Sequence, residues 1–117
     1  MIKIVEKYGN NFAIVDQNIK INDVQDALDI MANAQYLGKT NLVIIHKHSL
    51  NDDFYNLSTK FAGEVLQKFS NYNVRLAIIG DFSSINSKAL SAFIYECNKT
   101  KNVIWTNNLD NAYKQLI

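Results

Sequence analysis

The sequence predicts an α/β domain whose sheet is mixed and mainly parallel. Apolar runs such as residues 42–45 and 74–80 lack polar alternation, which is typical of strands covered on both faces in a parallel sheet. Segments with the apolar spacing of helices alternate with these runs, and such alternation implies parallel strands joined by right-handed crossovers. The predicted order is ββαβαβαβα, within a single domain over residues 1–117.

The first two strands are predicted at residues 2–5 and 12–15. Gly9 and Asn10 between them suit the positive backbone angles of a hairpin turn, so the two strands should form an antiparallel pair near one edge of the sheet. The later strands are predicted at residues 42–45, 74–80 and 103–105.

The first helix is predicted over residues 24–37. Asn22 and Gln25 form a capping-box pattern before it, and Gly38 is the stop signal after it. A single helical turn is expected within residues 51–57. The other helices are predicted at residues 58–72, 87–98 and 107–117, the last capped by Asn107 or Asn108.

The helix over residues 58–72 contains Gly63, although a glycine inside a helix costs about 1 kcal/mol relative to alanine. Its apolar face consists of Phe61, Ala62, Val65, Leu66, Phe69 and Tyr72. The opposite face carries the strip Thr59, Gly63, Gln67 and Ser70, bordered by the i,i+4 pair Glu64 and Lys68. Either the glycine is tolerated at an exposed position, or the strip is an interface against which another backbone packs closely.

Composition argues against several kinds of partner. The net charge is +1, with 12 basic and 11 acidic residues scattered along the chain, so we expect neither nucleic acid nor membrane as a partner. No stretch approaches the roughly 18 apolar residues of a membrane span, and the first residues lack the apolar run of a signal peptide. We therefore expect a cytoplasmic protein.

The single Cys97 cannot form an internal disulfide, and we expect it to be buried and inert.

Polar residues follow the predicted strands at the edge where open parallel sheets bind ligands. His46 and His48 lie on the same side of an extended backbone, and Asp81 follows the next strand, so these three residues are the candidate ligand or metal site. Surface or capping histidines and an aspartate turn are the alternative, and a His-x-His pair alone favours that alternative over a metal site. No glycine-rich loop follows any strand, and we expect no cofactor and identify no catalytic residues.

Four segments carry a family resemblance, in the order INDVQDALDIMANAQYLG, FAGEVLQKFSNY, RLAIIGDFS and FIYECNK. They resemble the bacterial domain-of-unknown-function 4180 family over nearly the whole chain. A more distant similarity is to STAS domains, which have the same ββαβαβαβα order and a comparable C-terminal helix. In STAS regulators a serine or threonine at the start of the second major helix is phosphorylated by a partner kinase. The resemblance makes Ser58 and Thr59 a candidate phospho-switch, although a helix N-cap is the explanation that the position of Ser58 favours.

Two functions remain open from the sequence. The first is a STAS-like regulatory or protein-interaction module that binds a protein partner or forms a homo-oligomer, with Thr59, Gly63, Glu64, Gln67 and Ser70 at the interface. The alternative is an enzyme that binds a small molecule or metal at the carboxyl ends of the parallel strands. The missing catalytic constellation favours the first function.

Overall fold

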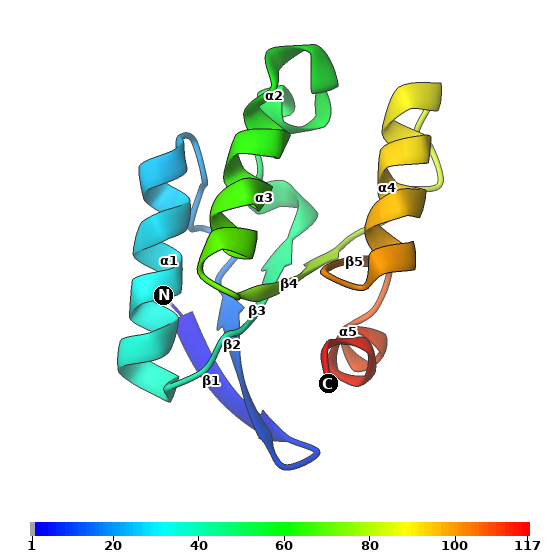
Figure 1. Ribbon diagram of the computed structural model, residues 1–117. Coiled ribbons are helices and arrows are strands. Elements are labelled where there is room, and N and C mark those ends of the chain that lie inside the picture. The colour runs from blue at the N-terminus through cyan, green and yellow to red at the C-terminus, as the bar shows by residue number, and fades with distance from the viewer. Residues whose placement is uncertain (1) are drawn as a thin grey trace.

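Figure 1 presents the protein as a computed structural model that describes residues 2–117. One sheet contains the five strands β1 (Ile2–Lys7), β2 (Asn10–Val15), β3 (Leu42–His46), β4 (Arg75–Ile79) and β5 (Val103–Thr106). The helices are α1 (Val24–Gly38), α2 (Asp52–Tyr55), α3 (Phe61–Asn71), α4 (Lys88–Thr100) and α5 (Leu109–Leu116). Two 3₁₀ turns, η1 (Lys47–Ser49) and η2 (Leu57–Thr59), flank α2. The predicted α/β class with a mixed, mainly parallel sheet is confirmed.

The five strands lie in the sheet in the same order as in the chain, β1-β2-β3-β4-β5. β1 pairs antiparallel with β2, and each later neighbouring pair is parallel. Because right-handed crossovers that all step in one direction place their connecting helices on one side, α1, α3 and α4 share a face of the sheet. Figure 1 shows these three helices side by side, with α5 on the other side.

Each parallel strand contributes alternate side chains to two apolar cores. Val43 and Ile45 of β3 face the larger core, which α1, α3 and α4 cover. Leu42 and Ile44 face the smaller core, which α5 covers. All four side chains are buried, as expected for a strand covered on both faces.

Two of the predicted helix and turn boundaries are wrong by one residue. Asp23, not Asn22, caps α1: its side chain accepts a hydrogen bond from the Asp26 backbone N–H, and the Asp26 carboxylate accepts one from the Asn22 backbone N–H. The hairpin turn uses Tyr8 and Gly9, both with positive φ, rather than Gly9 and Asn10. Asn10 is already the first residue of β2, where it pairs with Lys7.

The predicted helix over residues 58–72 is shorter in the structure. Lys60 adopts a left-handed conformation with φ of 65°, so η2 ends there and α3 begins at Phe61. At the other end α3 stops at Asn71, and Tyr72 is 64% exposed instead of belonging to the apolar face. Within residues 2–117 no helix is both long and apolar enough to cross a membrane.

Arg75, at the start of β4, joins the ends of two helices. Its guanidinium donates hydrogen bonds to the backbone carbonyls of Lys101, after α4, and of Gln115 and Leu116, in the last turn of α5. These carbonyls have no partner within their own helices, and a cation is favourable at the negative end of a helix dipole. One side chain therefore fixes both helix ends to the sheet.

Replacing Arg75 by Met keeps an apolar stem but removes the donors. We expect Arg75→Met to lower the free energy of unfolding by roughly 1–3 kcal/mol, because hydrogen bonds from a charged group are lost and helix-end carbonyls lose their partner. Urea unfolding followed by circular dichroism measures the change. The exposed Lys99→Met serves as the control and should shift stability by less than about 0.5 kcal/mol. Equal effects of the two substitutions would contradict this role of Arg75.

The β1–β2 hairpin holds the N-terminal turn of α5. The Tyr8 hydroxyl donates a hydrogen bond of 3.0 Å to the Asp110 carboxylate, which also forms an ion pair of 3.0 Å with Lys114. These contacts lower the pKa of Asp110, Lys114 contributing most and Tyr8 next. The charged form of Asp110 is therefore the one that stabilises the contact between hairpin and helix.

This contact predicts a pH dependence of stability. The pKa of Asp110 is lowered in the folded state, so its contribution is complete above the ordinary aspartate pKa and is lost as pH falls through the folded-state pKa. Tyr8→Phe should raise the pKa of Asp110 in an NMR titration and should reduce the loss of stability on acidification. Tyr36→Phe, at a residue that is 83% exposed, is the matched control. An unchanged pKa of Asp110 in Tyr8→Phe would refute the contact.

Candidate functional site

The two histidines of the sequence-predicted ligand site lie in different surroundings. His46 is the last residue of β3 and half-buried, and it lines a depression of about 510 Å³ together with Lys3, Ile14 and Asp16. His48 is exposed and lies in the 3₁₀ turn η1. The backbone there is no longer extended, so the prediction that both imidazoles lie on the same side of an extended strand does not apply. Within residues 2–117 no group of three or more His, Cys, Asp or Glu side chains is placed to hold a metal ion.

Asp81, the third residue of that candidate site, forms a tight turn after β4. Its carboxylate accepts hydrogen bonds from the Ser83 hydroxyl at 2.6 Å and from the Ser83 backbone N–H at 2.9 Å. Chiefly these bonds lower the pKa of Asp81. The Lys47 ammonium donates to the Asp81 carbonyl at 2.7 Å, which ties the turn to η1. The structure therefore gives Asp81 a turn role and does not join it to the histidines.

An aromatic cluster fills the larger core at the carboxyl ends of the parallel strands. Trp105 of β5 is its centre, and its closest ring neighbour is Phe82, with ring centroids 5.1 Å apart. Phe54, Tyr55 and Phe93 complete the cluster around the indole. On this face, side chains thus occupy the place where open parallel sheets commonly bind ligands. The cluster could not be predicted from the sequence, because its members come from four separate segments.

Ser58 and Thr59 lie in η2, before the start of α3. The Ser58 hydroxyl donates to the Asn56 side chain at 2.7 Å, and Ser58 does not cap α3. The Thr59 hydroxyl lies 2.6 Å from the Asp53 carbonyl oxygen and accepts a hydrogen bond from the Phe61 backbone N–H. Both residues are exposed. The candidate phospho-switch remains a prediction, placed at η2 rather than at a long helix.

Three members of the predicted strip line a groove between α3 and α4. Gly63, Gln67 and Ser70, together with Leu66, form the α3 side of this α3/α4 groove, whose volume is about 260 Å³. Thr59 lies outside α3 and does not line it. The opposite wall comes from α4 and the chain that follows it, and it consists of Phe93, Cys97, Thr100, Asn102 and Val103.

Cys97 is half-buried in the α3/α4 groove rather than sealed in the core. Burial raises the pKa of its thiol, so at neutral pH the group stays protonated and is a poor nucleophile. The thiol therefore contributes apolar surface to the groove, which agrees with the expected inertness but not with full burial.

Gly63 faces open space. A Cβ atom built on it meets no other atom within 4 Å, so the protein's own packing does not require a glycine there. Gly80 differs, because the aliphatic part of the Lys47 side chain packs directly against it. A Cβ atom at Gly80 would lie 2.5 Å from the Cβ of Lys47. Glu64 and Lys68 beside the strip do not pair with each other: among residues 2–117 the one ion pair is Lys114 with Asp110.

The two glycines make opposite predictions for the same substitution. Gly63→Ala should raise the free energy of unfolding by up to about 1 kcal/mol, because alanine is the better helix former and finds free space. Gly80→Ala should lower it by roughly 1–3 kcal/mol, because Lys47 must move. Urea unfolding of both variants measures the difference. Destabilisation by Gly63→Ala would mean that an unseen contact constrains this helix position.

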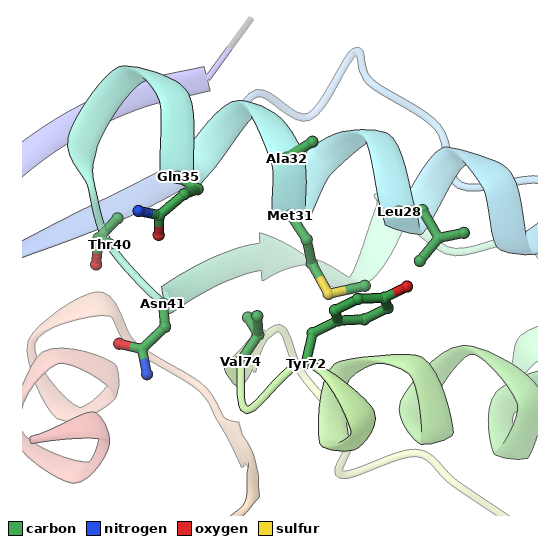
Figure 2. A pocket seen from close by; sticks show the side chains of 8 residues that line it. All are labelled: Leu28, Met31, Ala32, Gln35, Thr40, Asn41, Tyr72 and Val74. Carbon is green, nitrogen blue, oxygen red and sulfur yellow. The ribbon is translucent and has the colours of Figure 1, made fainter.

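A second cavity lies on the other side of α3, between α1 and α3 (Figure 2). Its volume is about 380 Å³, and its walls come from α1 and from the residues just before β3 and β4. The lining residues are Leu28, Met31, Ala32, Gln35, Thr40, Asn41, Tyr72 and Val74. This α1/α3 cavity lies at the amino ends of the parallel strands. The sequence had predicted a ligand site at the opposite edge, the carboxyl ends. The one feature of the sequence that could have indicated this cavity is Tyr72, at the end of the helix predicted over residues 58–72.

Fold and site together define a small α/β domain with an open sheet, three helices on one face and surface cavities on both sides of the middle one. The family model "Domain of unknown function (DUF4180)" matches residues 8–116, and the chain therefore belongs to this family. Comparisons with curated proteins and with solved structures find no match. The resemblance to the 4180 family is thus confirmed, and the similarity to STAS domains remains an expectation.

Proposed function

We propose that the chain is a protein-interaction module that docks a second copy of itself along α3. The observation that carries this proposal is the open space around Gly63 in a helix whose neighbouring residues Gln67 and Ser70 line a groove. Gly63 is the third residue of α3, where alanine is the better helix former, and no contact among residues 2–117 requires a glycine there. If another backbone packs closely on α3 from outside, a glycine is favourable at this position. Any side chain there would hold the two backbones apart.

The charges beside the strip favour a second copy as the partner. Glu64 and Lys68 are one turn apart on α3 and unpaired among residues 2–117. In a two-fold arrangement with antiparallel α3 helices, Glu64 of each copy meets Lys68 of the other, so both charges are matched. The net charge of +1 opposes such self-association only weakly.

The groove offers room for side chains of the docking surface. Phe93 and Cys97 supply its apolar wall, while Gln67 and Ser70 supply polar groups at the rim. An apolar centre with a polar border is the usual anatomy of a protein interface. The STAS resemblance is compatible with this role, because STAS regulators act on partner proteins, and the regulatory part of the expectation remains a proposal of the same kind.

Charge reversal tests the arrangement directly. Glu64→Lys and Lys68→Glu should each raise the dissociation constant of the dimer by roughly tenfold, because two attractive contacts become repulsive. The double variant Glu64→Lys with Lys68→Glu should restore association, since the pairs re-form with exchanged signs. Sedimentation equilibrium over a range of concentrations up to millimolar measures the three constants.

The matched control is Glu96→Lys, an exposed residue of α4 that does not line the groove. It changes the net charge as much as Glu64→Lys does and should leave the dissociation constant unchanged within about twofold. A wild-type protein that stays monomeric at millimolar concentration would end the proposal. A double variant no better than the single ones would exclude the antiparallel arrangement.

A further inference from the structure

We propose that the α1/α3 cavity binds a small uncharged molecule with an aromatic or apolar body and one amide or hydroxyl head. This inference is independent of self-association, because the cavity lies on the side of α3 away from the α3/α4 groove. Its volume of about 380 Å³ falls within the range of about 300–1,000 Å³ that is typical of small-molecule sites.

The two ends of the cavity differ in polarity, as Figure 2 shows. Leu28, Met31 and Tyr72 lie together at one end, and Figure 2 shows the Tyr72 ring beside the Met31 thioether. Gln35, Thr40 and Asn41 lie at the other end. A molecule that fills the cavity therefore needs an apolar body towards Tyr72 and a polar group towards Gln35.

The apolar end is suited to an aromatic ring. Tyr72 is 64% exposed although it follows a well-packed helix, so its ring already presents a face to solvent. Stacking of a second ring on such a face contributes about 0.5–1.5 kcal/mol beyond the buried area. The flexible and polarisable side chain of Met31 adapts its shape to whatever lies against it.

The polar end has hydrogen-bonding groups to spare. The Thr40 hydroxyl is already occupied, since it donates to the Asn11 carbonyl and accepts from the Leu42 backbone N–H. The Asn41 amide nitrogen donates to the Asn73 carbonyl, which leaves its side-chain oxygen free. Among residues 2–117 the Gln35 amide has no side-chain partner. Both amide oxygens and the remaining amide N–H groups are thus available to a ligand head that carries a donor and an acceptor.

The charge of the ligand follows from the lining. None of the eight lining residues is charged, and a carboxylate or ammonium group moved out of water into the cavity would find no counter-charge. Gln35 and Asn41 are exposed, so a charged head at this end keeps part of its hydration and its disadvantage is the missing counter-charge, whereas an uncharged amide or hydroxyl exchanges hydrogen bonds with both side chains. The cavity should therefore discriminate against charged analogues of the same shape.

The test uses two probes that differ in charge at one position, N-acetyl-tryptophanamide and N-acetyl-tryptophan. NMR titration of the ¹⁵N-labelled full chain should give saturable shifts centred on Gln35, Asn41 and Tyr72 with the amide. The carboxylate should bind several-fold more weakly. Absence of binding of the amide up to its solubility limit, or equal binding of both probes, would overturn the proposal.

Matched variants locate the binding. Tyr72→Ala should weaken binding of the amide about tenfold, because the stacking surface is lost. Tyr95→Ala is the control, since Tyr95 is 66% exposed on α4, away from the cavity, and it should leave the affinity unchanged. Gln35→Leu keeps a side chain of similar size but removes the hydrogen-bond partner of the ligand's polar head, and should also weaken binding of the amide. Loss of affinity in Tyr95→Ala alone would place the site elsewhere and refute this assignment.

Discussion

The sequential order of the strands is the constraint on which the rest of the structure depends. With the order β1-β2-β3-β4-β5, every right-handed crossover after the hairpin steps the same way across the sheet. The three longer helices must then lie on a single face, and the C-terminal helix alone covers the other. Figure 1 shows the consequence: α3 lies between α1 and α4, and it presents its outer side to solvent.

This arrangement accounts for where the cavities lie. At the carboxyl ends of the strands, α2 and the segment after β4 bring aromatic rings over Trp105 and close the core there. Two hollows remain beside α3: the α1/α3 cavity lies at the amino ends of the strands, and the α3/α4 groove runs along the side of α3 that faces α4. The usual ligand edge of an open parallel sheet is therefore filled on this face, while the surface around α3 remains accessible.

Much of the fold could be predicted from the sequence because it follows from local patterns. Apolar runs marked the buried strands, and their alternation with helical periodicity gave the order of elements. The helix boundaries were less predictable, since a single left-handed residue, Lys60, separates η2 from α3 and moves Ser58 out of the helix. No propensity rule marks a lysine for that conformation.

The site was predictable only in part. Helical geometry alone put Gly63, Gln67 and Ser70 on an outward face, and in the structure they line the α3/α4 groove. The cavity of Figure 2 could not be found in the same way, because it depends on α3 ending at Asn71 and on Tyr72 turning outward. The histidine pair could not be predicted either, because the chain turns into η1 directly after His46 and the extended backbone that the prediction assumed ends there.

The proposed docking surface for a second copy of this domain is the outer side of α3. Amide hydrogen exchange, measured by mass spectrometry on the full chain at high and at low protein concentration, tests it most directly. If a second copy docks there, exchange should be slower at high concentration only in α3 and the facing part of α4. Concentration-dependent protection at the β1 or β5 edge, or on α5, with α3 unchanged, would contradict it.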